Sequence, residues 1–544
     1  MKAAVTLLSL AVAGAAAVGS SSTSTWSGWG GNYLNNHWAA DNHDLNSTTV
    51  SSLSLHCKIP DSVGQSAPPA IRGEVAYYPT YNGSFVALNY SSCEVLWRIN
   101  VTQVLVNFRA ISALQLLVNT PISRTSPQID TANNVIYFGT QIHALLVAAD
   151  LTSGTVLGVT QTNPHELATI TTSPTFYDGL VIVGVSSGEE DAAFFSNGTY
   201  QCCSFIGNAA AFRFKRTGRS TGRFTTIWNV TTIPTNLPPA NGTSQWSGAA
   251  IWGSQPSIDV RRRQVFFATG NMYSVPDAYA HCVDDPDVHC FPSYIWQESV
   301  LAFDLYTGHA NWVRRLDSLD AWTLVCGGGG LPRNTTLCPQ NPGTDADFGM
   351  APTFIPGGSG SRTPQGRDLL AVGQKSGVLY GLAADSGDVL WSTLTSPGSE
   401  LAGLSWGVAA DDRRVYYTGI NDGQKTWVLQ PQNTTAVNNS IFGAADLRDG
   451  SLLWQIPVPD GDLSLVMPAV VGDVILTGST GPFAFSSPGP GALLALKQDT
   501  GEVLWSYELV GGFQGGVAVQ GKYVFLGTGY KGGTGGAFWV FKAS

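Results

Sequence analysis

Short apolar runs recur along the chain, and each is followed by turn residues. Val135–Gly139 and Leu369–Gly373 are continuous apolar runs that end on glycine, whereas residues 299–303 lead into the turn at 304–308. Apolar runs of this length, bounded by Asp, Thr and Gly, predict β-strands that are joined by tight hairpin turns. The segments between the copies lack helical periodicity. The pattern therefore predicts an all-β protein.

One turn motif, A-x-D-x-x-T-G-x-x-x-W, recurs and sets the predicted architecture. Seven turn motifs accompany eight copies of the strand that ends near glycine, and each copy is about the size of four strands. Two motifs are degraded, because Gly158 stands where Trp is expected and extra residues precede Trp228. This repetition predicts an eight-bladed β-propeller whose blades must stack to bury their faces. Packing between blades is the expected role of the repeated tryptophans, which are Trp97, Trp312, Trp391, Trp454 and Trp505.

The last copy of the repeat has no turn motif of its own. It ends at residues 538–541, close to the C-terminus. We expect the chain near residues 26–29 to supply the missing strand and so to close the ring. A propeller distributes its core between blades, so residues 21–544 are predicted to form one domain despite their length.

Composition and the two ends of the chain indicate a secreted protein. Met1 and Lys2 precede an apolar run that is rich in Ala and Leu, and small residues follow it, so residues 1–20 are predicted to be a signal peptide. The net charge of −10 argues against binding to nucleic acid or to an anionic membrane surface. Sequons predict a glycoprotein; they begin at Asn46, Asn82, Asn89, Asn100, Asn197, Asn229, Asn241, Asn334, Asn433 and Asn438.

The eight cysteines form an even set, as expected for disulfides in a secreted protein. Adjacency and proximity favour the pairs Cys57–Cys93, Cys202–Cys203, Cys282–Cys290 and Cys326–Cys338. An adjacent pair closes a small ring and offers a rigid sulfur face to a flat ligand. The alternative is that Cys202 and Cys203 are each bridged elsewhere. No zinc spacing and no C-x-x-C-H motif occur in the sequence, which argues against covalent haem.

Several polar residues follow predicted strands at points where they would face one end of a propeller. Three acids at 189–191 and Asn271 offer the oxygen ligands that Ca²⁺ prefers, although a solvated loop and a turn Asn explain them equally well alone. Asp320 lies beside Trp322 and is a candidate general base. Lys375 lies in a predicted turn, where a solvated lysine is the plain alternative.

The order of these motifs resembles the quinoprotein alcohol dehydrogenases. The sequence has S-x-x-E, then W-G, T-G-N, D-x-W and K-x-G-x-x-Y, and it is most similar to the polyvinyl-alcohol-dehydrogenase-like branch in residues 202–205, 345–349, 373–377 and 404–407. This resemblance implies an eight-bladed propeller that carries pyrroloquinoline quinone (PQQ) and Ca²⁺. The implied metal ligands are Glu189, Asn271 and Asp320, with Asp320 also the base and Glu190 an alternative to Glu189. The implied cofactor-binding residues are Trp252, Lys375, Thr171, Ser186, Trp406, Cys202 and Cys203.

We therefore predict a secreted oxidoreductase that oxidises an alcohol to a carbonyl and passes electrons to an external acceptor. The alternative is a secreted propeller that has lost the cofactor and binds a glycan or a protein. Ile206, where the resemblance leads us to expect a basic residue, favours this binding module. The survival of several site-like residues together favours the enzyme. The oligomeric state is left open by the sequence.

Overall fold

A computed structural model gives the fold of the chain. It describes residues 26–237, 245–283, 285–327, 331–334, 338–339, 341–400, 402–482, 489–530 and 535–544. The predicted signal peptide and the sequon at Asn241 lie outside the described residues. Within those residues, no helix is both long enough and apolar enough to cross a membrane.

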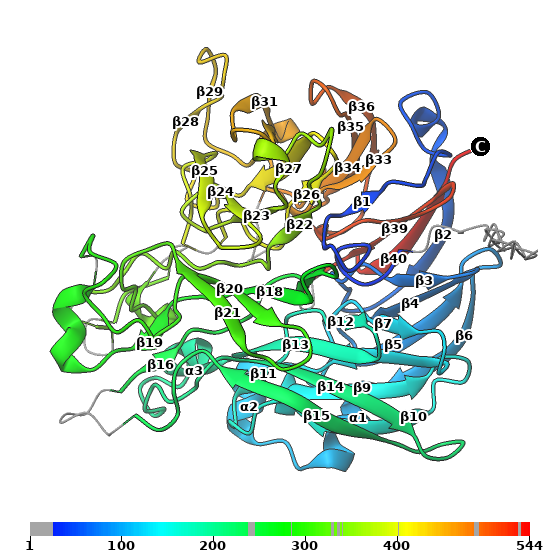
Figure 1. Cartoon of the computed structure of the whole chain (residues 1–544). Helices are drawn as coiled ribbons and strands as arrows, with labels where there is room; N and C mark the ends of the chain where they lie inside the picture. The colour runs from blue at the N-terminus through cyan, green and yellow to red at the C-terminus, as the bar shows by residue number, and fades with distance from the viewer. Residues whose placement is uncertain are drawn as a thin grey trace, which may run out of the picture.

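The described residues form eight four-stranded antiparallel blades around a common centre (Figure 1), which confirms the predicted fold class. The first four blades follow one another along the chain. Blade 1 contains β3 (Ala70–Arg72), β4 (Val75–Pro79), β5 (Ser84–Asn89) and β6 (Glu94–Asn100); blade 2 contains β7 (Gln128–Asp130), β8 (Val135–Gly139), β9 (Leu145–Asp150) and β10 (Val156–Gln161); blade 3 contains β12 (Thr175–Tyr177), β13 (Leu180–Ser187), β14 (Asn208–Arg216) and β15 (Gly222–Thr231); blade 4 contains β17 (Ser257–Asp259), β18 (Gln264–Ala268), β20 (Ser299–Asp304) and β21 (Ala310–Arg315).

The remaining four blades complete the ring, and the last of them combines strands from both ends of the chain. Blade 5 contains β22 (Thr353–Ile355), β23 (Leu369–Gly373), β24 (Val378–Ala383) and β25 (Val389–Leu394); blade 6 contains β26 (Ala409–Ala410), β27 (Arg414–Gly419), β30 (Ile441–Asp446) and β31 (Leu452–Pro457); blade 7 contains β33 (Ala469–Val471), β34 (Val474–Ser479), β35 (Ala492–Lys497) and β36 (Val503–Glu508); blade 8 contains β38 (Ala518–Gln520), β39 (Tyr523–Thr528), β40 (Ala537–Lys542) and β2 (Ser54–Pro60).

The strand that closes the ring is β2, which pairs antiparallel with β40 and lies beside it in Figure 1. The expectation that residues 26–29 would supply this strand was wrong. The Trp26 carbonyl instead accepts a hydrogen bond from the N–H of Ile71 in blade 1, at 2.8 Å. The Trp29 indole donates to the carbonyl of Trp406, at 2.7 Å. The segment therefore lies across the ends of blades, close to the centre, instead of extending one of them.

In blades 3 to 6 the repeated tryptophan links its blade to the turn of the next one. The indole N–H of Trp391 in blade 5 donates to the Leu447 carbonyl in blade 6, at 3.0 Å. Its ring lies against Gly450 of the same turn so closely that an added Cβ would lie 2.5 Å from Trp391 Cε3. The tryptophan and the turn glycine are thus two halves of one contact between blades. Equivalent bonds run from Trp228 to Leu305, Trp312 to Ala384 and Trp454 to Gln498.

The blade that lacks the tryptophan has no room for one. A Cβ added to Gly158 in β10 would lie 2.8 Å from the carbonyl oxygen of Gly222, which starts β15 of blade 3. The β14–β15 hairpin therefore occupies the space that the indole fills elsewhere. This close approach explains the degraded motif.

A few short elements lie outside the four-stranded pattern. The helices α1 (Val101–Phe108) and α2 (Ala113–Val118) connect blades 1 and 2, and the side chains of Asn100 and Ser112 cap their N-termini. A third helix, α3 (Glu189–Phe195), lies between β13 and β14 of blade 3. The short strands outside the blade pattern are β1 (Trp38–Ala39), β11 (Ala168–Thr169), β16 (Ser247–Gly248), β19 (Met272–Ser274), β28 (Trp427–Val428), β29 (Ala436–Val437), β32 (Leu465–Val466) and β37 (Gln514–Gly515).

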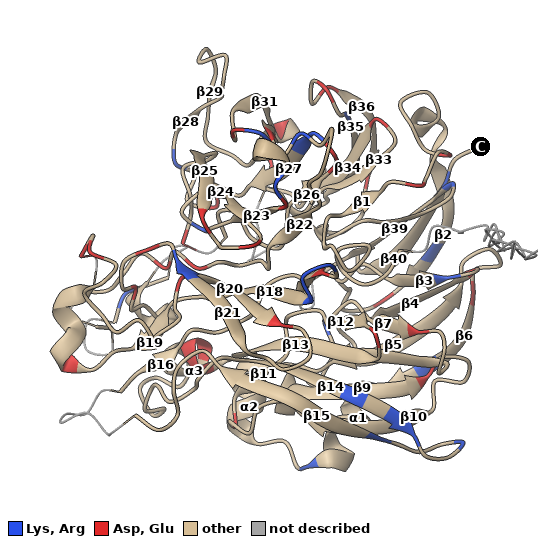
Figure 2. Cartoon of the chain, viewed as in Figure 1, with Lys and Arg blue, Asp and Glu red and all other residues tan. Residues whose placement is uncertain are grey.

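All four predicted disulfides are confirmed: Cys57–Cys93, Cys202–Cys203, Cys282–Cys290 and Cys326–Cys338. The first of them joins β2 to the turn before β6, so it ties the closing strand of blade 8 to blade 1. Acidic residues gather at the start of α3, where Figure 2 shows the ribbon in red. This group leads to the candidate site.

Candidate active site in the central cavity

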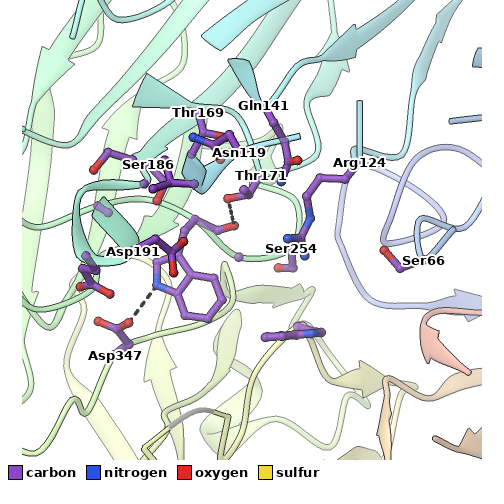
Figure 3. A pocket seen from close by; sticks show the side chains of 18 of the residues that line it. Ser66, Asn119, Arg124, Gln141, Thr169, Thr171, Ser186, Asp191, Ser254 and Asp347 are labelled. Carbon is purple, nitrogen blue, oxygen red and sulfur yellow. Dashed lines mark hydrogen bonds between the residues drawn. The ribbon is translucent and has the colours of Figure 1, made fainter. Parts of the chain in front are cut away.

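A cavity of about 320 Å³ lies where residues from many blades meet. One part of its lining is acidic and aromatic, and the other part carries neutral polar groups and one arginine (Figure 3). The predicted residues Thr171, Ser186, Trp252, Asn271, Lys375 and Trp406 all line this cavity. Glu189, Asp320, Cys202 and Cys203 are absent from the lining.

Asp347 is the carboxylate that the surrounding backbone holds most firmly at the cavity. Its Oδ1 accepts the N–H of Asn271 at 2.6 Å, and its Oδ2 accepts the indole N–H of Trp252 at 3.1 Å, which Figure 3 also shows. Asn271 lies between β18 and β19, immediately before β19, and its amide N–H₂ donates to the carbonyl of Trp322 at 2.8 Å. This hydrogen bond fixes the orientation of the side-chain amide, so its carbonyl oxygen stays available to another partner.

Lys375 occupies the turn after β23, but it is buried instead of solvated. Its ammonium nitrogen lies 2.8 Å from Asp345 Oδ2 and 3.0 Å from Asp347 Oδ2. It also lies 5.4 Å from the centre of the Trp252 ring. Burial opposes the positive charge, but Asp345 and Asp347 outweigh this effect and raise the pKa of Lys375. The lysine is therefore charged when it faces the cavity.

Two tryptophans form the apolar wall of the acidic part. The rings of Trp252 and Trp406 are nearly perpendicular, with centres 5.5 Å apart and planes at 83°. The Trp252 carbonyl accepts the hydroxyl of Thr171 at 2.7 Å, and its ring nitrogen is bound to Asp347. Trp252 is thus fixed at both ends, as a flat wall against which an aromatic ligand can stack.

Of the two adjacent glutamates, Glu190 lines the cavity and Glu189 points away from it. Glu189 is fully buried, and its carboxylate accepts the hydroxyl of Tyr200 at 2.5 Å and the N–H groups of Ser204 and Phe205 at 2.9 and 2.8 Å. Burial would raise its pKa, but hydrogen bonds from His165, Tyr200 and Phe205 outweigh burial and lower it. The prediction of Glu189 as the cavity ligand therefore needs correction to Glu190.

The carboxyl group of Glu190 is in an electrostatically unfavourable place. Burial and the nearby carboxylates of Asp345 and Asp347 raise its pKa well above the ordinary value, while Lys375 acts in the opposite direction. A bound cation would relieve this repulsion. The cavity therefore has both the oxygen donors and the charge that favour a cation.

Asp320 lies behind the cavity wall, next to the acidic cluster. Its Oδ2 accepts the N–H of Ala346 at 2.8 Å, and its buried Oδ1 has no hydrogen-bond partner. Burial raises its pKa to about 7. Its backbone carbonyl accepts the N–H of Met272, so the strand that carries it lies alongside the residue after Asn271. Asp320 therefore lies close to the cavity residues but does not line the cavity as the prediction required. Asp347 lines the cavity wall instead.

The adjacent cysteines are bonded to each other, but they do not cap the cavity. Cys203 is buried in the apolar cluster that also contains Phe205 and Tyr273, and Cys202 is exposed. Neither cysteine is among the residues that line the cavity, so the structure does not support the predicted contact of the sulfur face with a ligand there.

The far part of the cavity carries polar groups, two of which the sequence analysis missed. Arg124 lines it and is hydrogen-bonded to Tyr530. Thr169 lines it as well, and its buried hydroxyl oxygen has no hydrogen-bond partner. Figure 3 shows Arg124, Gln141, Thr169 and Thr171 around this part. No motif marked Arg124, which lies in a loop before β7, and only its charge in an otherwise weakly charged region could have drawn attention to it.

Taken together, the cavity offers a flat aromatic wall, a buried ammonium group, oxygen ligands for a cation and polar groups at the opposite end. This combination suits a flat, anionic ligand bound next to a metal ion. Comparison with known proteins bears on what such a site in an eight-bladed propeller does.

The chain is similar to two polyvinylalcohol dehydrogenases along most of its length. It is 27% identical over 538 residues to the enzyme from Pseudomonas sp, which covers 93% of this chain and 73% of the relative. It is 26% identical to the enzyme from a Sphingopyxis species, with the same coverage of both chains. Residues 437–543 match the family described as outer membrane protein assembly factor BamB.

Solved structures show the same fold. A europium-containing methanol dehydrogenase superposes with a TM-score of 0.66 at 16% identity, covering 96% of this chain and 98% of its own. A quinohemoprotein alcohol dehydrogenase from Comamonas testosteroni has a TM-score of 0.66 at 15% identity, with 96% and 80% covered. The chain is thus similar in sequence to polyvinylalcohol dehydrogenases and shares its fold with alcohol dehydrogenases of the quinoprotein type, in agreement with its motifs, and this similarity supports an oxidoreductase.

Proposed function

We propose that the protein is a secreted quinoprotein that oxidises an alcohol to a carbonyl with PQQ and Ca²⁺ bound in the central cavity. The observation that carries this proposal is the convergence of Glu190, Trp252, Asn271, Asp347 and Lys375 on one cavity. These residues come from blades 3, 4 and 5 and from the loops beside them. Their convergence provides a site that suits the dehydrogenase chemistry suggested by the similar proteins.

The residues of the cavity fit PQQ, which is flat and carries carboxylates. Trp252 offers a fixed ring for stacking, and Lys375 lies across that ring as a donor toward a carbonyl oxygen. Arg124 and the unpartnered hydroxyl of Thr169 suit the carboxylates of the ligand at the other end of the cavity. Thr171 and Ser186 line the space between these ends, as the resemblance implied.

The oxygens of Glu190, Asn271 and Asp347 fit Ca²⁺, because they are hard ligands on one wall. When bound, PQQ supplies a two-electron acceptor and Ca²⁺ supplies a Lewis acid. Asp320 is not proposed as a direct ligand. It lies behind this wall and influences the site through its electrostatic interaction with the neighbouring acidic residues.

Asp347 is proposed as the general base in place of Asp320. It lines the cavity, and three donors hold its carboxylate: the Asn271 N–H, the Trp252 indole and Lys375. A substrate hydroxyl that approaches the cavity wall can give its proton to Asp347. Lys375, 3.0 Å from its Oδ2, orients this carboxylate at the cavity wall.

The electrons are proposed to pass to an external acceptor, as the similarity to dehydrogenases implies. Four disulfides and the predicted signal peptide support a secreted protein.

The test is reconstitution of the purified protein with PQQ and Ca²⁺, followed by its absorption spectrum and dye-linked alcohol oxidation. We expect Asp347→Asn to lower kcat by a factor of about 10² to 10⁴, as loss of a general base does. Asp320→Asn, its matched control in the same cluster, should lower kcat less. Wild-type turnover in Asp347→Asn would overturn the assignment of the base. Absence of PQQ binding by the wild-type protein would favour a cofactor-free binding module.

A further inference from the structure

Glu189 is buried next to the candidate site but faces away from it, and nothing in the proposed chemistry uses it. Its side chain makes a dense set of contacts with one loop, residues 200–205. Buried carboxylates are costly unless they are fully hydrogen-bonded, so such an arrangement needs a reason. The reason lies in the helix that Glu189 begins.

We propose that Glu189 is a positioning residue that fixes the first turn of α3, so that Glu190 faces the cavity; this inference rests on the proposed cation site. Successive residues of an α-helix project about 100° apart around its axis. With the Glu189 side chain held in the loop, the next side chain is directed to another side of the helix. Glu190 is found there, in the lining of the cavity.

The anchor is built from several donors that converge on the Glu189 carboxylate. Oε1 accepts the Tyr200 hydroxyl at 2.5 Å and the Ser204 N–H at 2.9 Å, and Oε2 accepts the Phe205 N–H at 2.8 Å. His165 Nε2 lies 3.3 Å from Oε1. The helix itself starts at Gly188 without a side-chain cap, so its orientation depends on such tertiary contacts.

The anchor also connects to the other cation-binding segments. The Phe205 carbonyl accepts the N–H of Gly248 at 2.8 Å, and the N–H of the next residue, Ala249, donates to the Asn271 carbonyl at 2.7 Å. The Asn271 N–H then binds Asp347 at 2.6 Å. A continuous run of hydrogen-bonded segments thus extends from Glu189 to the Asp347 carboxylate at the cavity wall.

The sequence alone does not show that Glu189 and Glu190 have different roles. Two adjacent glutamates offer the same chemistry, and only the direction of each side chain separates them. Glu190 provides the charge at the cavity, whereas Glu189 holds the segment that carries it. The conservative replacement Glu189→Gln keeps the size of the side chain but presents an amide N–H₂ to a cluster of N–H and O–H donors.

The test measures cation binding to the PQQ-free protein, with Tb³⁺ luminescence and displacement by Ca²⁺, so that it does not depend on turnover. Glu189→Gln should weaken cation binding by a factor of about 10, and Tyr200→Phe by a smaller factor, because one donor to the anchor is lost. Glu189→Asp, which keeps the charge, should restore part of the affinity. Glu94→Gln, on the outer strand of blade 1, serves as a control with unchanged affinity.

A purely structural role would give a different pattern. It would lower the Tm of Glu189→Gln while leaving the cation affinity of the folded protein at the wild-type value, and that result would overturn the inference. If Glu189→Gln does not fold, Tyr200→Phe and His165→Gln carry the same test, and wild-type affinity in both would also overturn it. Failure of the wild-type protein itself to bind the cation would instead refute the proposed cation site.

Discussion

One ammonium group, Lys375, lies among several buried carboxyl groups beside the cavity. It contacts Asp345 at 2.8 Å and Asp347 at 3.0 Å, and both carboxyl groups are nearly inaccessible to solvent. Removing one partner of a buried ion pair leaves an uncompensated charge, which is far more damaging than losing a surface pair. At the scale of single residues, Lys375 is therefore the group on which the others depend.

We predict that Lys375→Met lowers the free energy of unfolding of the metal-free protein by about 3–5 kcal/mol, as breaking a buried pair does. Ca²⁺ should reduce this loss, because a bound cation supplies the missing positive charge. Urea unfolding with EDTA and with Ca²⁺ measures both effects. Lys425→Met, at an exposed position, is the matched control. A loss equal to that of the control would contradict the central role of Lys375.

Asp320 gives a prediction of pH dependence with a defined sign. Its pKa is raised by burial from 3.8 to about 7 in the folded protein. Between these values the folded state keeps a proton that the unfolded state has released, so the free energy of unfolding falls as the pH rises. The fall amounts to about 1.4 kcal/mol for each pH unit over this interval for one such proton.

Asp320→Asn lacks this proton, so its unfolding free energy should fall less steeply than that of the wild type from pH 4 to 7. Above pH 7 the difference between the two proteins should stay constant. Burial also raises the pKa values of Glu298 and Asp345, and the Asp320 carboxylate adds to both, so the comparison reports Asp320 together with its effect on these two neighbours. Urea titrations in metal-free buffer measure the difference. Parallel pH profiles would show that Asp320 is ionised in the folded protein.

The residue scale is also where sequence analysis reached its limit. Its predicted residues Trp252, Asn271 and Lys375 do line the cavity. It named Glu189 with Glu190 as the alternative, because a seven-residue helix has too little periodicity to show which side chain faces inward. It gave Asp347 no role beside Asp320, because both residues lie outside helices and strands, where the course of the chain depends on tertiary contacts.

At the scale of elements, the turn of each blade is the unit that joins it to its neighbour. The indole of Trp391 bonds to Leu447 and covers Gly450, which has a φ of +71°. Both requirements fall on one glycine: it must adopt a left-handed conformation, and it must leave space for the ring. This explains why the T-G-x-x-x-W pattern could be recognised so clearly in the sequence.

We predict that Gly450→Ala destabilises the protein more than Gly179→Ala does. Gly179 has a φ of +73°, but no atom lies within 4 Å of the position of an added Cβ. The two substitutions share the backbone cost, so the difference between them reports the clash with Trp391. We expect this difference to be about 1–3 kcal/mol, as for overpacking of a tight contact. Equal losses in urea unfolding would mean that the ring moves aside freely.

At the scale of the whole molecule, the ring is closed by strands from the two ends of the chain. The number of blades could be predicted, because seven turns and eight strand copies require one strand from elsewhere. The identity of that strand could not, because β2 (Ser54–Pro60) has no turn motif and its pairing with β40 is a contact across nearly the whole sequence. Non-local pairings of this kind leave no local pattern.

A closed ring has a weak point where its ends meet, and the Cys57–Cys93 disulfide lies there. It ties β2, which belongs to blade 8, to the turn before β6 of blade 1. Disulfides restrict the unfolded chain and typically contribute about 2–4 kcal/mol. This bridge also holds the closing strand against the neighbouring blade, so its loss should act on the junction first.

We predict that replacing both Cys57 and Cys93 with alanine lowers the Tm and speeds hydrogen exchange in β2 and β40 before other strands. The matched control is the pair Cys282–Cys290, whose cysteines are eight residues apart in an excursion between β18 and β20. Its removal should leave exchange in β2 and β40 unchanged, because it does not join blades. If hydrogen exchange in β2 rose equally in both double variants, the Cys57–Cys93 disulfide would have no specific role at the junction. The ring would then be held closed by strand pairing and packing alone. If exchange in β2 rose only in the Cys57–Cys93 variant, this disulfide would be what keeps the ring closed. The central cavity, which the ring encloses, would then depend on a disulfide between its first and last blades.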